Sequence, residues 1–287
     1  MYPAFIITSA LLVFSSKFEF FSCHLKDLGE KNLSLVHLFE EFEERILGGQ
    51  NAALRDYPFN VQFFNYGGLC GGTILTRKTV LTAAHCFDYN SNIGEMKIVS
   101  SAHRVRHDRA SSMHSIWDFI LHEEYNIPKK YSNDLAVIII HDSFKFSSNV
   151  QKAILTNSNA WTKETRPKFV ATGWGIVEKT RRRLFQKTYL RYVPRRDCSH
   201  MSGLELRAGM FCLFGDQVTD TCRGDSGGGI VWNKVVVGVV SHGVGCLDSP
   251  SVYMDVYYFR SWIHETVKTT YNRFNKFHAA GKQNKTE

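Results

Sequence analysis

The stretch Asp220–Gly229 reads DTCRGDSGGG and places Ser226 between an aspartate and a run of glycines. A serine hydroxyl attacks a carbonyl group only when a base removes its proton and donors stabilise the oxyanion that forms. Gly224 has no side chain to shield its N–H, so this N–H and that of Ser226 can both face an oxyanion. Taken alone, the stretch also fits a glycine-rich turn between two strands. The rest of the chain has to decide between these interpretations.

Two earlier stretches carry the residue types that activate a serine. Thr82–Cys86 reads TAAHC and contributes His85, and the pair Asn133-Asp134 contributes a carboxylate. Taken separately, His85 fits a core histidine beside a cysteine, and Asp134 fits a capping aspartate at a strand end. Together with the stretch around Ser226, and in the order His, Asp, Ser, they resemble the trypsin/chymotrypsin family of serine proteases.

This resemblance extends from about Ile46 to Lys268 and carries clear implications. It implies an all-β fold of two packed six-stranded antiparallel β-barrels with a C-terminal α-helix. It implies a serine endopeptidase in which Ser226 is the nucleophile, His85 the general base and acid, and Asp134 the group that orients His85. The N–H groups of Gly224 and Ser226 would form the oxyanion hole. The resemblance also implies protein or peptide substrates, and we expect neither a metal nor a cofactor.

The resemblance also implies a specificity pocket. Asp220 stands where trypsin-like members carry a carboxylate at the pocket floor, which would bind the Arg or Lys of a substrate. Its walls would include Ser241, Gly243 and Ser251.

The chain departs from the family pattern at this pocket. His242 stands where tryptophan is usual, and Ser251 stands where most trypsins have glycine. The sequence therefore leaves two alternatives open. One is an altered primary specificity. The other is a secreted protein on a protease fold that is never processed and serves only in binding.

The N-terminal region predicts export and activation by cleavage. Residues 1–16 are largely apolar and too short to span a membrane, which indicates a signal peptide. We interpret residues 17–45 as a propeptide. The sequence Arg45-Ile46-Leu47-Gly48-Gly49 resembles the activation junction of the family, whose cleavage would let the new Ile46 amine pair with Asp225. We therefore expect a secreted, extracellular zymogen. Its partners would be an activating protease and protein inhibitors.

Cysteine usage supports an oxidising compartment. Seven cysteines are present, of which Cys23 stands apart and six lie in the region that resembles a protease. The spacing alone does not choose among their pairings. The resemblance implies the pairs Cys70–Cys86, Cys198–Cys212 and Cys222–Cys246, and leaves Cys23 outside the catalytic domain.

Composition excludes several other classes. The net charge of +8 would suit a nucleic-acid binder, but the chain has no zinc-finger spacing, RNP box or homeodomain pattern, so we expect no nucleic-acid partner. We expect a peptidase domain over residues 46–268 and a flexible polar tail over residues 269–287. Short β-branched and aromatic runs predict strands, and apolar residues at helical spacing between Val256 and Val267 predict one late helix. The clearest strand runs are Val61–Phe64, Thr73–Leu75, Val80–Ala83, Leu135–Ile140, Phe169–Thr172, Val235–Ser241 and Val252–Val256.

Overall fold

The computed structural model describes residues 49–105, 111–174, 184–215, 220–221, 224–245 and 247–283. By its contacts the chain divides into a unit of Met1–Phe42 and a unit of Glu43–Glu287, and the following account concerns the second unit. The predicted signal peptide and nearly all of the predicted propeptide lie in the first unit, and residues 43–45 also lie outside the described residues.

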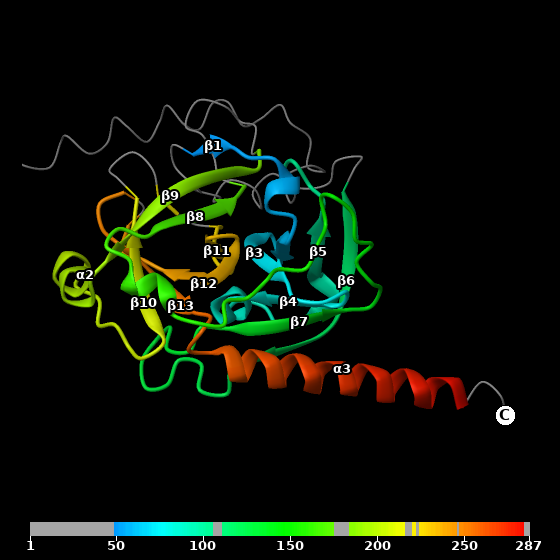
Figure 1. The fold of residues 1–287 in the computed structure, drawn as a ribbon. Helices are drawn as coiled ribbons and strands as arrows, with labels where there is room; N and C mark the ends of the chain where they lie inside the picture. The colour runs from blue at the N-terminus through cyan, green and yellow to red at the C-terminus, as the bar shows by residue number, and fades with distance from the viewer. Residues whose placement is uncertain are drawn as a thin grey trace, which may run out of the picture. The chain divides into compact units, whose positions relative to one another are not determined.

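The N-terminal half of this unit is a closed antiparallel β-barrel (Figure 1). Alternate residues of its strands point inward, so that Val61, Phe63 and Ile98 are fully buried in its core. The strand Ser112–Leu121 has a bulge between Ile116 and Asp118, which lets it curve around the barrel. In barrel order the strands are β2 (Asn60–Asn65), β3 (Gly68–Ile74), β4 (Thr79–Thr82), β7 (Ala136–Ile140), β6 (Ser112–Leu121) and β5 (Met96–Ser100).

The C-terminal half is a second antiparallel barrel of six strands, which closes because β9 pairs with both β8 and β10. A short strand, β1 (Gln50–Asn51), adds to the outer edge of β9. Phe169, Leu190 and Tyr253 are fully buried in the core of this barrel. Its strands are β8 (Lys168–Gly173), β9 (Gln186–Val193), β10 (Met210–Phe214), β13 (Ser251–Asp255), β12 (Val235–His242) and β11 (Gly229–Trp232).

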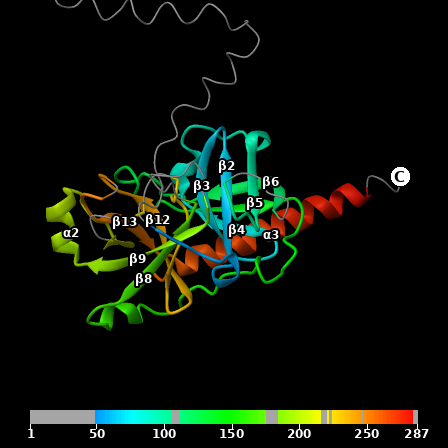
Figure 2. The same cartoon turned by 90° about the horizontal axis from the view of Figure 1, so that it is seen from above.

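The two barrels pack side by side, as both views show (Figures 1 and 2). A hydrogen bond of 3.0 Å joins the hydroxyl of Thr172 in β8 to the side-chain oxygen of Asn60 in β2, and both residues are buried. The prediction of two six-stranded barrels is confirmed, and each of the seven strand runs quoted above overlaps a strand.

One short helix was not predicted. α2 (Arg195–Ser202) follows β9, begins after Pro194 and ends at Gly203, whose φ of +67° is the left-handed conformation that ends many helices. Only Cys198 of this helix is buried. A helix with a single buried residue shows no hydrophobic periodicity, which is why the sequence did not reveal it.

The C-terminal helix is much longer than predicted. α3 runs from Arg260 to Gln283, whereas the polar composition from residue 269 onward predicted a flexible tail. That prediction is wrong for residues 269–283, because buried Thr270 and Phe274 continue the apolar face that begins at Ile263.

The surface of the first barrel holds this added length of helix. The ring of Phe274 meets Trp117 of β6 edge-on, with ring centroids 5.3 Å apart, and the ammonium group of Lys78 lies 4.3 Å from the Phe274 centroid. Arg273 forms an ion pair of 3.0 Å with Asp118 of β6. Despite its 24 residues α3 is too polar to cross a bilayer, and no other helix among the described residues is long and apolar enough to do so.

Candidate active site

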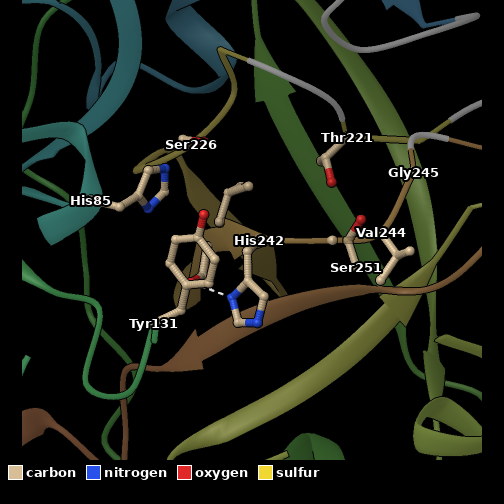
Figure 3. A pocket seen from close by; sticks show the side chains of 11 residues that line it. His85, Tyr131, Thr221, Ser226, His242, Val244, Gly245 and Ser251 are labelled. Atoms are coloured by element: carbon tan, nitrogen blue, oxygen red, sulfur yellow. Dashed lines mark hydrogen bonds between the residues drawn. The ribbon is translucent and has the colours of Figure 1, made fainter. Parts of the chain in front are cut away.

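A cavity of about 340 Å³ opens where the two barrels meet (Figure 3). One end holds His85 and Ser226, the other end holds Thr221 and Ser251, and Tyr131 and His242 lie on one side between them. Its lining comes from both barrels: His85, Tyr131, Thr221, Ser226, Val240, Ser241, His242, Gly243, Val244, Gly245 and Ser251.

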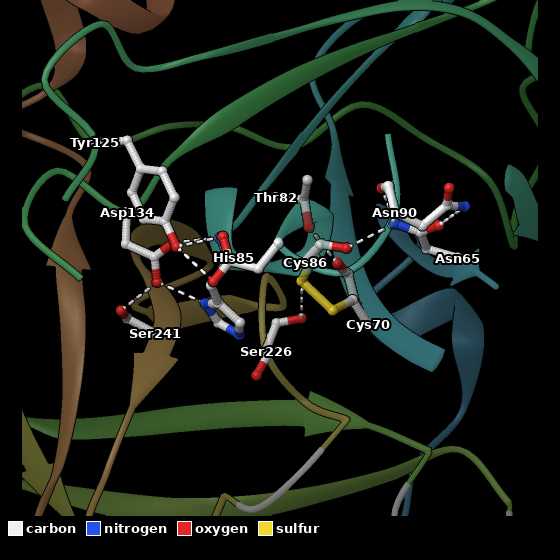
Figure 4. The surroundings of a disulfide bond; sticks show 12 residues. Asn65, Cys70, Thr82, His85, Cys86, Asn90, Tyr125, Asp134, Ser226 and Ser241 are labelled. Carbon is white, nitrogen blue, oxygen red and sulfur yellow. Dashed lines mark hydrogen bonds and ion pairs between the residues drawn. A yellow bond between two sulfur atoms is a disulfide. The ribbon is translucent and has the colours of Figure 1, made fainter. Parts of the chain in front are cut away.

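His85 is held by the buried carboxylate of Asp134. His85 lies in the short 3-10 turn Ala84–Phe87 that follows β4, and Asp134 lies at the end of the loop between β6 and β7. The backbone N–H of His85 donates to Asp134 Oδ1 at 2.8 Å, and His85 Nδ1 lies 2.7 Å from Asp134 Oδ2. Ser241 Oγ donates to the same Oδ2 at 2.5 Å. These contacts leave Nε2 as the ring nitrogen of His85 that is available to a substrate-binding cavity (Figure 4).

The environment of this pair shifts both pKa values. Burial lowers the pKa of His85, but the charge of Asp134 and the hydrogen bond to it outweigh burial, so the pKa of His85 is raised. Burial raises the pKa of Asp134, but the charge and hydrogen bonds of His85 and the bond from Ser241 hold it below its usual range. The pair therefore favours a protonated imidazole beside an ionised carboxylate, which suits a base that accepts a proton during a reaction.

Ser226 lies in the loop before β11 and is fixed by contacts with both barrels. The N–H of Gly71 in β3 donates to the carbonyl oxygen of Ser226 at 2.7 Å, and the N–H of Gly227 donates to the carbonyl oxygen of Val240 in β12 at 2.8 Å. A Cβ atom at Gly227 would collide with Thr82 Oγ1 and would lie only 2.6 Å from the carbonyl oxygen of Gly71. The glycine after the serine is therefore required by close packing rather than by a generic turn.

Gly224 adopts a φ of +92°, a conformation that residues with a side chain rarely adopt. The backbone before Ser226 thus takes a course that depends on glycine.

A buried carboxylate, a histidine bonded to it and a serine on one cavity wall are together the parts of a hydrolase site. Residues 46–263 also match the family model described as Trypsin. The chain belongs to the trypsin family. It is a serine endopeptidase, and its substrates are proteins.

Several similar relatives of this trypsin-family chain come from flies. It is 31% identical to trypsin epsilon of Drosophila erecta over 240 residues, which cover 80% of this chain and 91% of that relative. It is 30% identical to a trypsin of Sarcophaga bullata, covering 79% of this chain and 91% of the relative. It is 29% identical to hypodermin-A of Hypoderma lineatum, covering 79% and 89% respectively.

The far end of the cavity differs from the expected specificity pocket in one respect. Ser241, Gly243 and Ser251 line it, and Thr221 lines it in addition. Asp220 is fully buried and accepts the N–H of Thr221 at 2.7 Å, but among the described lining residues Thr221 is present and Asp220 is not. Asp220 thus lies behind the lining rather than in it.

Hydroxyl groups gather at this end of the cavity of the trypsin-family enzyme. Thr221 Oγ1 lies 2.7 Å from the hydroxyl oxygen of the buried Tyr253. A Cβ atom at Gly243 would lie 3.0 Å from Ser251 Oγ, so the hydroxymethyl group of Ser251 narrows the space between these two walls. Burial raises the pKa of Tyr253 and the nearby charge of Asp220 raises it further, so this hydroxyl stays neutral.

Several predicted site residues cannot be placed. Arg45 and Ile46 of the activation junction lie outside the described residues, as do Cys222 and Cys246. Asp225, the expected partner of Ile46 in the activated enzyme, is described and has an exposed fraction of 2%. Cys23 also lies outside the described residues.

Two of the expected disulfides are present. Cys70–Cys86 ties β3 to the turn that carries His85, as Figure 4 shows, and Cys198–Cys212 ties α2 to β10. In the described part of the chain, the one group with suitable spacing for a metal is Cys70, Cys86 and His85. Because its two sulfur atoms are bonded to each other, this group offers no thiolate to a metal ion.

Sequence reasoning missed Tyr131, which the structure brings to the centre of the site. Its ring meets that of His85 edge-on at a centroid distance of 5.7 Å and stacks on that of His242 at 4.5 Å. Tyr131 stands three residues before Asp134, and that proximity was the only sequence signal.

A second set of the same three residue types lies on the first barrel, with the carboxylate of Asp142 exposed at its surface. His114 contacts Ser100 Oγ at 3.0 Å and Asp142 Oδ2 at 2.8 Å. Ser100 and His114 are both buried, with exposed fractions of 2% and 4%, and neither lines the cavity. Access to substrate, rather than the hydrogen bonds themselves, therefore distinguishes the site at Ser226.

Proposed function

We propose that this enzyme cleaves polypeptides after Lys or Arg, with Ser226 as the nucleophile, His85 as the general base and acid, and Asp134 as the residue that orients His85. One observation carries the proposal: His85, which is bonded to the buried Asp134, lies on the wall of the cavity that Ser226 also lines. The two residues come from the first barrel and the serine from the second, so the site exists only at their junction.

The chemistry assigned to these residues is acyl transfer. Ser226 Oγ attacks the carbonyl carbon of the scissile bond while His85 Nε2 takes the hydroxyl proton. Asp134, ionised and bonded to Nδ1, stabilises the imidazolium that forms. Breakdown of the tetrahedral intermediate returns this proton to the leaving amine, and a water molecule then hydrolyses the acyl-enzyme by the same steps.

The oxyanion of each intermediate would be held by the N–H groups of Gly224 and Ser226. The positive φ of Gly224 supports this assignment, because it gives the backbone before the serine a course that a larger residue would not adopt. Removing one donor of this kind costs about 3–4 kcal/mol of transition-state stabilisation.

Asp220 supports cleavage after a basic residue. It is a buried acid next to the lining residue Thr221, so a Lys or Arg side chain that enters the cavity would approach its charge. The relatives described as trypsins support the same assignment.

Activation and secretion complete the proposal. The family match begins at Ile46, directly after Arg45, which supports a mature enzyme that starts at this residue. The free Ile46 amine would then pair with Asp225, which is buried. Two disulfides and the apolar residues 1–16 support export to an oxidising compartment, where an activating protease and protein inhibitors would act on the enzyme.

The proposal is tested with the full chain, activated by immobilised trypsin that is removed before the assay. Matched peptide substrates ending in Arg, Lys or Phe before the reporter group give kcat/KM for the wild type, Ser226→Ala and Asp220→Ser. We expect no measurable turnover by Ser226→Ala and a loss of Lys and Arg cleavage in Asp220→Ser. Full activity of Ser226→Ala would refute the catalytic assignment, and unchanged cleavage after basic residues in Asp220→Ser would refute the specificity.

A further inference from the structure

His242 takes part in a hydrogen-bond chain that reaches Asp134. Ser241 Oγ lies 2.5 Å from Asp134 Oδ2 and 3.0 Å from His242 Nδ1. The hydroxyl has one proton, and an ionised carboxylate can only accept, so this proton points to Asp134. The lone pairs of Ser241 Oγ therefore accept the Nδ1–H of His242. This order assigns the ring of His242 to the tautomer that carries its proton on Nδ1.

A second set of contacts joins the same residues through their rings. The ring of His242 stacks on Tyr131 with an interplanar angle of 21°, and Tyr131 meets His85 edge-on at 83°. Figure 3 shows Tyr131 lying between the two imidazoles. The five residues His85, Asp134, Ser241, His242 and Tyr131 thus form a closed ring of contacts.

The backbone of Tyr131 is strained to bring its ring to this place. Its φ is +64°, a left-handed conformation that is unfavourable for a bulky residue. The N–H of Tyr131 donates to Asn126 Oδ1 at 2.7 Å, which holds the strained conformation. Strain of this kind is retained where the surrounding structure over-determines it, most often at functional sites.

We propose that His242 is a positioning residue of the catalytic pair: by donating to Ser241 and stacking on Tyr131 it closes the ring of contacts that holds Asp134 and His85. The inference rests on the proposed role of His85 and Asp134 and adds a residue to it. In this role His242 acts through Ser241.

Burial is the main reason that the ring of His242 stays neutral in this role. Burial lowers the pKa of His242 to about 4, the charge of Asp134 opposes that change, and the charges of His85 and Lys130 add to it. The ammonium group of Lys130 lies 4.8 Å from the centroid of Tyr131. A neutral ring at this place leaves the imidazolium of His85 without a competing positive charge from His242.

The donation has a calculable effect on His85. One hydrogen bond strengthens its neighbour in a chain by about 10–30%. Losing the bond from His242 weakens the bond from Ser241 to Asp134, which leaves more negative charge on Asp134 and raises the pKa of His85. The expected rise is roughly 0.2–0.6 pH unit.

The test compares His242→Phe with His242→Asn. Phenylalanine keeps a ring against Tyr131 but has no donor, whereas the amide of asparagine branches at the same atom as the imidazole and places an N–H near the position of Nδ1. His264→Phe, on the exposed face of α3, is the matched control for the loss of an imidazole.

The readout is the pH dependence of inactivation by phenylmethylsulfonyl fluoride, which requires no preference for a substrate residue. Ser226 Oγ forms a bond to sulfur, the S–F bond breaks, fluoride leaves and His85 takes the proton. We expect the midpoint of the acid limb to rise by roughly 0.2–0.6 pH unit in His242→Phe and to stay within about 0.1 pH unit of wild type in His242→Asn and His264→Phe. An unshifted limb in His242→Phe, or an equal shift in His242→Asn, would overturn the proposal.

A measurement on the unaltered enzyme keeps the proposal testable if these variants do not fold. Nitrogen-15 chemical shifts of His242 should report a neutral ring with its proton on Nδ1 between about pH 6 and 8. A proton on Nε2, or a charged ring in this range, would overturn the proposal. This readout does not depend on Ser226, so its failure is distinguishable from a failure of the proposed function. A failure of the proposed function would appear as inactivation of Ser226→Ala by phenylmethylsulfonyl fluoride at the wild-type rate.

Discussion

Replacing Asp134 with asparagine should abolish most of the activity without removing the fold. Asp134 Oδ2 accepts from His85 Nδ1 and from Ser241 Oγ, and Oδ1 accepts the backbone N–H of His85. An asparagine whose oxygen keeps the bond to the backbone presents its NH₂ group to the other two donors. His85 can then bond to this amide only by accepting through Nδ1, which moves its proton to Nε2 and blocks the transfer from Ser226.

The size of the loss follows from the bonds that disappear. Two charge-assisted hydrogen bonds to Oδ2 are lost, each contributing about 1.5–3 kcal/mol. Their sum is about 3–6 kcal/mol, which corresponds to a decrease in kcat of roughly 10²- to 10⁴-fold.

The assay is the rate of acylation in a single turnover, with thermal unfolding of each variant as a control for folding. Asp134→Ala serves for comparison, because alanine removes the same bonds but has no NH₂ group to select the wrong tautomer of His85. We expect Asp134→Asn to be at least as slow as Asp134→Ala. An Asp134→Asn enzyme that keeps more than about a tenth of the wild-type rate would refute the argument from tautomers.

Four further predictions concern other parts of the chain. Arg45→Gln should prevent activation by trypsin, and activity equal to that of the processed wild type would contradict the proposed switch. Because the pKa of His85 is raised, the acid limb of kcat/KM should have its midpoint above the ordinary histidine value of about 6.5, since the base works only when deprotonated; a midpoint below that value would show that another group controls the limb. Ser251→Gly should increase the ratio of Arg to Lys cleavage, because removing the hydroxymethyl group widens the wall beside the planar guanidinium, and an unchanged ratio would reject this reasoning. Phe274→Ala should lower the free energy of unfolding, measured by chemical denaturation, by about 2–4 kcal/mol, because the ring is buried against Trp117. It should leave kcat unchanged, because Phe274 lies far along α3. A decrease below about 0.5 kcal/mol would mean that this part of the helix adds nothing to stability.

The sequence alone was sufficient for the fold class and for the residues proposed to be catalytic. His85 and Ser226 each lie within a short stretch whose neighbours are fixed by bonding or close packing: Cys86 bonds to Cys70, and Gly227 fits where no larger residue would. Each requirement fixes the identity of a residue next to the functional one, so it leaves a readable pattern in a short stretch. The strands were readable because short runs of β-branched and aromatic residues between turn residues are typical of strands.

Tertiary structure decided what depends on distant segments. Tyr131 and His242 are far apart in the sequence, and only the junction of the two barrels stacks one ring on the other. The extent of α3 was hidden in a polar stretch, because Phe274 and Phe277 contact Trp117 of β6, which is distant in the sequence. Ser100 and His114 carry a hydroxyl and an imidazole as the active site does, but both are buried and neither lines the cavity. Residue types and local spacing thus determined which chemistry this chain contains, whereas the packing of one barrel against the other decided where substrate can reach it.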